Sequence, residues 1–344
     1  MNRLLLLGPF PPPYGGVAIY DQALLEILRE RGLDAHRRAI RVEPGPDAVP
    51  PGLAGVRSLF RETGADDVVL DSATWLLEYP VFRIAAAWFP LRRFRRFRWI
   101  KVIHDGTLPG RFHAMPAARR AIGRRAVAEA DAVVVVEPGL ARWVSSALGR
   151  DEGVHVIPSL LPLPPSAVPG PPQPAEDAGG KVVASVGVFT EPYGFRDLAE
   201  AVERLRGETG IPLELVLLDG GFADDPDYRR ATLRGRSWIR TLPPMARAEV
   251  LRVLGSSDVF VRPSRHEAYG LCRVEALWME TPVVATNVGE TRGMRTYAAG
   301  DVGALAGRIL EVLRDPGARD EARTAGDRFR AEAEANLASL VRLL

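Results

Sequence analysis

Short apolar runs alternate with helical patterns along the whole chain. "RLLLLG" precedes the amphipathic "VAIYDQALLEILRERG", and "DDVVLDS", "WIKVIHDG" and "ADAVVVVE" follow with helical segments around them. Continuous Val, Ile and Leu runs of this length, bounded by Gly and Asp, are typical of strands in a buried parallel sheet. The pattern therefore predicts an α/β domain, a doubly wound Rossmann-like unit over residues 1–160.

A proline- and glycine-rich stretch interrupts this alternation. "LPLPPSAVPGPPQPAEDAGG" has neither a helical nor a strand period, which indicates an interdomain linker at residues 161–180. The alternation then resumes with "KVVASVG", "PLELVLLDGG" and "DVFVRPS". We predict a second Rossmann-like domain at residues 181–325, and a charged C-terminal helix at residues 326–344 that is able to pack back on the first domain.

Composition agrees with two soluble domains. The chain has 344 residues, 47% of them hydrophobic and 26% charged, and a net charge of +2. Its single cysteine excludes an internal disulfide and a cysteine-cluster metal site, and fits a reducing cytoplasm. The apolar run at the N-terminus is too short for a signal peptide, and no run reaches the roughly 18 residues of a spanning helix. We expect a cytoplasmic protein that does not cross a membrane.

Two glutamates flank the start of one predicted helix in "PSRHEAYGLCRVEALWM". Ligands of open parallel sheets bind outside the carboxyl ends of the strands, where this loop lies. Gly270 would open the helix without a side chain, and its free N–H groups suit a phosphate. Glu267 in the loop can point beyond that phosphate, and Glu275 can accept two hydroxyl hydrogen bonds from a ribose. The alternative is a solvated helix with two surface glutamates.

The same segment resembles a known family signature. "P-S-x-x-E-x-(Phe/Tyr)-G-L-x-x-x-E-A", followed by "PVVAT" and a glycine turn, is similar to the E-x7-E signature of retaining glycosyltransferase family 4. The resemblance implies the GT-B fold, in which two Rossmann-like doubly wound parallel-sheet domains face each other across a cleft. It also implies that Glu267 contacts the donor sugar in catalysis and that Glu275 binds the nucleotide ribose. The amides of Gly270 and Leu271 would hold the donor diphosphate.

Other parts of the chain match this family less closely. Gly15 and Gly16, in "GPFPPPYGG", match its first strand-to-helix glycine pair, which leaves room for substrate at a helix N-terminus. His104, in "KVIHDG", resembles a family histidine near the donor sugar and is a second candidate catalytic residue; its alternative role is structural. Gly289 and Glu290 stand where the family usually has two glycines, so that match is partial.

The chain departs from the family at one loop. "VGVFTEPYG" aligns with "G-R-L-x-x-x-K-G", whose arginine and lysine neutralise the donor diphosphate, and has Val188 and Tyr193 in their places. A departing diphosphate needs such stabilisation. A neighbouring arginine could supply the charge, the donor could be unusual, or the protein could be a non-catalytic relative. We favour the first explanation, with three candidates: Arg196 and Arg265, which we include among the donor-binding residues, and Arg292.

A basic aromatic stretch precedes "KVIHDG". Seven arginines and lysines and no acidic residue lie between residues 81 and 104, interleaved with Phe94, Phe97 and Trp99. We interpret Arg92–Trp99 as a peripheral contact with an anionic membrane, with arginines on headgroups and aromatic rings at the interface. The alternative is a partly buried helix with a solvated arginine face. A nucleic-acid partner is not expected, because the rest of the chain lacks supporting basic patches.

Together these features predict a retaining hexosyltransferase of polysaccharide biosynthesis. It would move a hexose from a nucleotide-sugar donor to a hydroxyl of a glycan or lipid-linked acceptor, at the inner face of the membrane. No cofactor and no metal are expected. Two alternatives stay open: a catalytically silent GT-B binding or scaffold protein, which the missing Arg/Lys pair favours, and a sugar-nucleotide epimerase, which fits the E-x7-E pattern less well.

Overall fold

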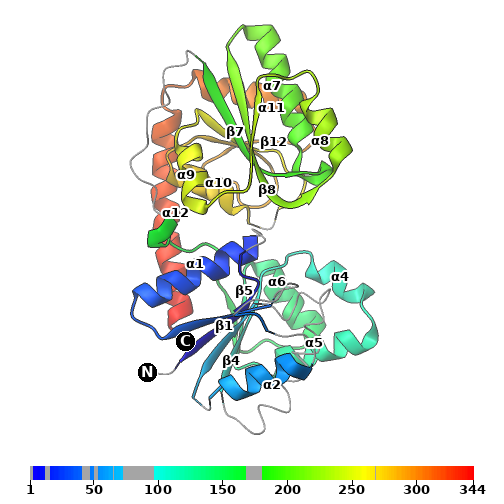
Figure 1. The fold of residues 1–344 in the computed structure, drawn as a ribbon, viewed down its shortest axis with the longest axis vertical. Helices are drawn as coiled ribbons and strands as arrows, with labels where there is room; N and C mark the ends of the chain where they lie inside the picture. Colours follow the sequence, from blue (N-terminus) through cyan, green and yellow to red (C-terminus); the bar gives the residue numbers. More distant parts are fainter. Residues whose placement is uncertain are drawn as a thin grey trace. The chain divides into compact units, whose positions relative to one another are not determined.

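A computed structural model describes residues 3–11, 16–40, 47–49, 53–64, 66–72, 97–167, 180–267 and 269–344. The chain divides into two compact units, and Figure 1 shows a parallel sheet with helices in each. The first unit is Met1–Pro164 with Glu334–Leu344, and the second is Pro165–Ala333. Among the described residues, no helix is both long and apolar enough to cross a bilayer.

The first unit contains a six-stranded parallel sheet with strand order β2-β1-β3-β4-β5-β6. Its strands are β1 (Leu4–Gly8), β2 (Ala35–Ala39), β3 (Val68–Asp71), β4 (Arg98–Ile103), β5 (Ala132–Val135) and β6 (Val154–Val156). Its helices are α1 (Gly16–Glu30), α2 (Leu53–Glu62), α4 (Leu108–Ala114), α5 (Ala117–Glu129) and α6 (Pro138–Trp143), which a π-turn continues over Val144–Leu148.

The leucine run of β1 shows why this sheet is buried on both faces. Leu5 and Leu7 pack in one apolar core with Trp99, whereas Leu4 and Leu6 pack in another with α1. Successive side chains of a strand point to opposite faces, so a continuous apolar run supplies both cores. The predicted parallel-sheet architecture of this half is confirmed.

The second unit repeats the arrangement with strand order β12-β11-β10-β7-β8-β9, again parallel throughout. Its strands are β7 (Lys181–Phe189), β8 (Leu213–Asp224), β9 (Ile239–Leu242), β10 (Val259–Arg262), β11 (Val283–Thr286) and β12 (Arg295–Tyr297). Its helices are α7 (Phe195–Thr209), α8 (Pro226–Leu233), α9 (Arg247–Gly255), α10 (Leu271–Trp278), α11 (Val302–Arg314) and the first part of α12 (Ala318–Val341).

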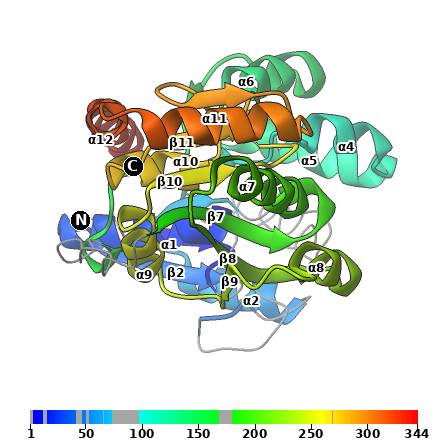
Figure 2. The same ribbon diagram turned by 90° about the horizontal axis from the view of Figure 1, so that it is seen from above.

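Helices α7 and α11 lie side by side over this second sheet (Figure 2). Their apolar faces, including Phe195, Leu198, Leu305 and Ile309, are fully buried in one core with strands β7, β8, β10 and β11.

The C-terminal helix begins at Ala318, earlier than the predicted residue 326. Its last turns belong to the first unit, where Leu337 and Leu340 are fully buried in the core that contains α1. Asn336 donates a hydrogen bond from Nδ2 to the carbonyl of Leu160, 3.2 Å away.

Candidate functional site

The loop between β10 and α10 lies at the carboxyl edge of the second sheet. β10 ends at Arg262 and α10 begins at Leu271. Gly270 caps the helix with a φ of 81°, a conformation that favours glycine, and no side chain caps the first turn. The first N–H groups of α10 are therefore uncapped by any side chain, as an anion site requires.

Glu267 lies in this loop as a buried carboxylate. Its side chain is 10% exposed, and Oε1 accepts hydrogen bonds from Nε of Arg262 and from Oγ of Ser264, the latter 2.9 Å away. Burial alone would raise the pKa of Glu267, but the charges of Arg262 and Arg273 and these hydrogen bonds outweigh it and lower the pKa. Glu267 is therefore ionised at neutral pH.

Glu275 is the second buried carboxylate, one turn into α10. It is 7% exposed; its Oε1 accepts a hydrogen bond from Nε of Arg247 at 2.8 Å and forms an ion pair with Nη2 at 2.7 Å. This ion pair engages one carboxylate oxygen and leaves Oε2 outside it. Because both glutamates are buried, the alternative of two solvated surface glutamates is wrong.

Two buried arginines complete this loop. Arg262 is 8% exposed; Nη1 donates to the carbonyl of Val186, and the guanidinium lies over the ring of Tyr193, 4.9 Å from its centroid. Arg273 is fully buried. It donates hydrogen bonds to the carbonyls of Val288 and Glu290, and so ties α10 to the turn after β11.

Sequence reasoning missed both arginines. One stands at the last position of an apolar strand, and the other on the buried face of an amphipathic helix. A charged residue at an apolar position is unusual unless it has a partner, so these two arginines could have been recognised from the sequence as candidates for a buried site.

The single cysteine lies beside these charges, in the first turn of α10. Cys272 is partly buried, and burial raises its pKa to about 11, against the opposing influence of the Arg262 guanidinium. The thiol is therefore neutral at physiological pH and adds no negative charge to the loop.

The predicted diphosphate arginines are engaged elsewhere. Arg196 pairs with Glu191 at 3.0 Å, and Arg265 pairs with Glu191 at 2.9 Å and with Asp197 at 3.2 Å. Arg292 forms ion pairs with two further carboxylates, Glu290 at 2.6 Å and Glu332 at 3.0 Å. Each of the three positive charges is thus matched by a carboxylate, and none forms an ion pair with Glu267 among the described residues.

In the first unit, His104 follows the end of β4. Its Nδ1 is 3.0 Å from Oγ of Ser159, and its ring meets the ring of Tyr20 edge to face at 4.6 Å. Nε2 is buried and has no hydrogen-bond partner among the described residues. Burial lowers the pKa of His104 to about 4, so the ring is neutral at physiological pH. Gly16 begins α1, and Gly15 lies outside the described residues.

A buried polar cluster, which the sequence did not predict, lies at the ends of β3 and β4 and on α1. Asp71 accepts hydrogen bonds from Lys101 Nζ at 3.2 Å and from Trp99 Nε1 at 3.1 Å. Ser72 donates to Asp21 at 2.6 Å. Burial raises the pKa of Asp21 well above its usual value, and the charge of Asp71 adds to this rise. Burial therefore favours the protonated form of Asp21.

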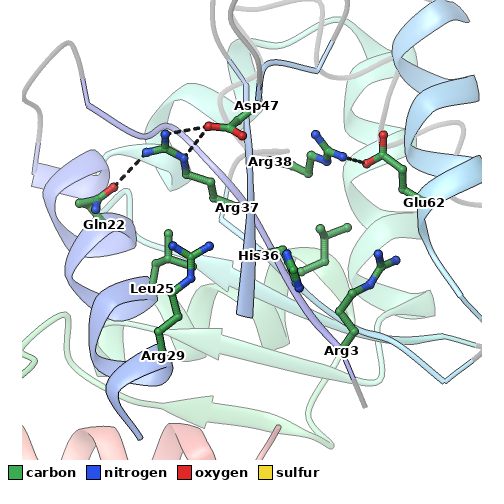
Figure 3. A pocket seen from close by; sticks show the side chains of 10 residues that line it. Arg3, Gln22, Leu25, Arg29, His36, Arg37, Arg38, Asp47 and Glu62 are labelled. Carbon is green, nitrogen blue, oxygen red and sulfur yellow. Dashed lines mark hydrogen bonds and ion pairs between the residues drawn. The ribbon is translucent and has the colours of Figure 1, made fainter. Parts of the chain in front are cut away.

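The first unit also has a cavity of about 430 Å³ along the edge strand β2 (Figure 3). Its wall carries several cations, but Arg37 pairs with Asp47 and Gln22, and Arg38 pairs with Glu62. Because these charges are matched within the wall, and because the cavity follows the length of β2, we do not assign it to the site at the strand ends.

The aromatic residues of the proposed membrane contact lie partly in the core. Phe97 is 3% exposed and Trp99 is fully buried on β4. Their assignment to a membrane interface is therefore wrong: pairing of β4 between β3 and β5 places Trp99 inside, and Phe97 packs in the same core. Arg92–Arg96 and Phe94 lie outside the described residues, and a membrane contact through these arginines stays a prediction.

The second unit matches a known family model, described as "Glycosyl transferases group 1", over residues 180–315. This segment is similar to group 1 glycosyltransferase domains. It contains Glu267, Glu275 and both buried arginines. Among the described residues, no group of three or more His, Cys, Asp or Glu side chains is placed to hold a metal ion.

Curated proteins similar to this chain carry glycosyltransferase and synthase names. The chain is 28% identical over 229 residues to alpha-maltose-1-phosphate synthase of Mycolicibacterium smegmatis, covering 56% of this chain and 55% of that protein. It is 33% identical over 163 residues to the lipopolysaccharide core biosynthesis glycosyltransferase LpsE of Rhizobium meliloti, covering 45% and 44%. The O-antigen chain mannosyltransferase B of Escherichia coli is 31% identical over 150 residues, covering 41% and 39%. The chain spans about half the length, or less, of these relatives.

Solved structures match nearly the whole chain at low identity. Sucrose-phosphate synthase from Thermosynechococcus elongatus superimposes with a TM-score of 0.74 at 19% identity, covering 99% of this chain and 98% of that one. Anabaena Alr3699/HepE in complex with UDP-glucose gives a TM-score of 0.71 at 15% identity, covering 98% and 99%. These likenesses confirm the predicted GT-B fold, as two Rossmann-like parallel-sheet domains.

Proposed function

We propose that the protein is a retaining hexosyltransferase that uses a nucleotide-sugar donor. One observation carries this proposal: two buried carboxylates, Glu267 and Glu275, flank the uncapped N-terminus of α10 at the carboxyl edge of a parallel sheet. The group 1 match over the same segment supports it, as do the names of the relatives.

The geometry of the loop gives each group a role. The N–H groups at Gly270 and Leu271 would bind the donor diphosphate, because the helix N-terminus carries partial positive charge. Glu275 would accept hydrogen bonds from the ribose through Oε2, since Arg247 holds only Oε1. Glu267, ionised and fixed by Arg262 and Ser264, would face the donor sugar. The acceptor hydroxyl would then attack the anomeric carbon on the face that the diphosphate leaves.

The first unit is proposed to bind the acceptor, a glycan or a lipid-linked glycan. The relatives named for O-antigen and lipopolysaccharide core support this class of acceptor. His104 is neutral and has a buried ring nitrogen, so it can exchange hydrogen bonds with a sugar hydroxyl without adding charge. The reaction as proposed needs no cofactor or metal and takes place on the cytoplasmic side.

A second candidate function is a catalytically silent binding protein. The observation that favours it is the absence of a cation at Val188, which is fully buried, and at Tyr193. Such a protein would bind a nucleotide or a glycan without transferring sugar.

The test begins with thermal denaturation of the protein in the presence of UDP, GDP and ADP and their hexose conjugates. A ligand that binds the native state raises the melting temperature by mass action. The donor found in this way is then incubated with candidate acceptors, and the products are analysed by mass spectrometry and by NMR of the anomeric proton. A product with the donor's anomeric configuration supports the proposal. Binding without transfer or donor hydrolysis supports the silent protein, and an inverted product refutes the retaining mechanism.

A further inference from the structure

The buried charges around the β10–α10 loop do not balance. Two guanidiniums, Arg262 and Arg273, are 8% and 0% exposed, and they share one buried carboxylate, Glu267, which interacts with both. Glu275 does not correct the imbalance, because Arg247 already pairs with it. The carboxylates of Glu290 and Glu332 both pair with Arg292. Among the groups that interact with Glu267, the loop therefore holds two buried positive charges and one negative charge.

An unmatched buried charge is costly, so a protein that retains one normally has a partner for it. Arg273 forms no ion pair among the described residues and donates to backbone carbonyls instead. Its Nε is buried without a hydrogen-bond partner in that part of the chain. A side chain added at Gly270, the helix cap, would come within 3.2 Å of this nitrogen. The surplus charge thus lies next to the uncapped N-terminus of α10.

Arg262 is the arginine with remaining capacity to reach a ligand. Nε donates to Glu267 and Nη1 to the carbonyl of Val186, and the guanidinium also forms a hydrogen bond with the side chain of Tyr193, so about two of its five N–H groups remain for a ligand. The ring of Tyr193 supports one face of the guanidinium. Gly194, with a φ of 71°, lets this turn approach the carbonyl of Pro263, where no side chain would fit. The backbone thereby brings Tyr193 to Arg262.

We propose that Arg262 contacts the diphosphate of the nucleotide-sugar donor, with Arg273 behind it as a positioning residue that adds positive charge. This inference rests on the proposed function and extends it. When the bond between the anomeric carbon and the diphosphate oxygen breaks, the oxygen keeps the electron pair, and Arg262 stabilises the charge that develops there. Arg262 thus provides what Val188 and Tyr193 do not, from the strand beside their loop.

The test compares the affinity of variants for ligands with and without a diphosphate. The probes are inorganic pyrophosphate, the nucleoside diphosphates UDP, GDP and ADP, and the corresponding nucleosides, titrated calorimetrically. Arg262→Gln should weaken binding of pyrophosphate and of the preferred nucleoside diphosphate by about ten- to a hundredfold, as loss of a charged hydrogen bond does. Affinity for the nucleoside should stay within about twofold.

A rescue variant separates contact with the diphosphate from support of Glu267. Because the Tyr193 ring lies directly against the guanidinium, Tyr193→Lys in the Arg262→Gln background places an ammonium at the same spot and should recover much of the diphosphate affinity. Arg240→Gln, an exposed arginine on β9 that pairs with Glu214, is the matched control and should bind as the parent does. If Arg262→Gln does not fold, Arg262→Lys replaces it, with an expected loss of about three- to tenfold for the diphosphate alone.

The outcomes distinguish this inference from the function on which it rests. If the parent prefers a diphosphate to its nucleoside and the Arg262 variant keeps the same preference, the inference is overturned and the proposed function stands. If the parent shows no preference for the diphosphate, both fail. A selective loss of diphosphate affinity that Tyr193→Lys restores supports the inference, whether or not transfer has been detected.

Discussion

Each unit has a polar cluster at the ends of its parallel strands, and the two clusters differ in the ionisation of their side chains. In the first unit, Lys101 is paired with Asp71, and burial raises the pKa of Asp21 and keeps His104 neutral. In the second unit, the partners of Glu267 outweigh its burial and keep it ionised, and two buried guanidiniums lie around it. Burial dominates in one cluster and charge partners dominate in the other.

This difference shows that a shared architecture leaves the chemistry of each strand edge open. Both sheets are six-stranded and parallel, with buried apolar strands at their centres. The electrostatics depend on a few side chains at the strand ends. Under the proposed function, the second unit would bind an anion such as a diphosphate, and the first an uncharged polar ligand such as a sugar hydroxyl.

The largest expected effect is a loss of stability when the cation is removed from the buried ion pair of the first unit. Lys101→Met leaves Asp71 buried without its cation, and it should lower the free energy of unfolding by about 3–5 kcal/mol. Denaturant titration measures this loss. The only other lysine, Lys181, provides a matched control, because its pair with Asp258 is half exposed, and Lys181→Met should cost less than about 1 kcal/mol. The double variant Lys101→Met/Asp71→Asn should recover most of the lost stability. Equal losses for the two lysine variants would contradict the prediction that Lys101 neutralises a buried Asp71.

In the second cluster, Glu267→Gln should lower the turnover number and leave the affinity for the nucleotide intact. We expect turnover to fall about a hundredfold, because a fixed carboxylate facing the donor sugar is lost. Affinity for the nucleoside diphosphate should not fall, since the substitution increases the surplus positive charge. Steady-state kinetics and calorimetry measure the two quantities. Glu214→Gln, on the exposed β8–β9 ion pair, is the control. Parental turnover in the Glu267 variant would remove this residue from the site.

The neutral state of His104 predicts a pH dependence of stability. Its folded pKa of about 4 lies below its ordinary value of 6.5, so the unfolded chain binds more protons between these values. The contribution of this residue to stability is therefore present above pH 6.5 and is lost as pH falls towards 4, by about 1–2 kcal/mol between pH 7 and pH 5. His104→Gln should reduce the difference in unfolding free energy between these two pH values by this amount. An unchanged pH dependence would show that the imidazole titrates normally.

The smallest effect concerns the ribose. Glu275→Gln keeps an oxygen for Arg247 but removes the charge, and it should weaken nucleotide binding by about 1 kcal/mol. The specific measurement is discrimination between a ribonucleoside diphosphate and its 2′-deoxy analogue. The parent should prefer the ribonucleotide about fivefold, and the variant should bind both alike. Equal discrimination by both proteins would refute a ribose contact at this position.

The sequence predicted the strands and the glutamate pair because both depend on local pattern. A continuous apolar run predicts a buried strand whichever strand it pairs with. Glu267 and Glu275 belong to one short loop and the helix that follows it. The buried arginines could not be predicted in this way. Whether Arg262 faces solvent or the loop depends on the approach of Tyr193 from another segment.

Long-range pairing also explains the error at Phe97 and Trp99. Beside a run of arginines their rings are typical of a membrane surface, yet the register of β4 with β3 and β5 places Trp99 in the core with its Nε1 on Asp71. Position in the sheet, which no local pattern specifies, determines their environment.

The suppressed ionisation of Cys272 makes it a slow nucleophile in the folded protein. Alkylating reagents react with thiolates, and with a pKa of about 11 only about one thiol in ten thousand is deprotonated at pH 7. When the first turn of α10 opens, the thiol regains an ordinary pKa and reacts faster. Because the chain has no other cysteine, the rate at which iodoacetamide modifies the protein reports how often this turn opens locally. A bound nucleotide that keeps the turn closed would lower this rate.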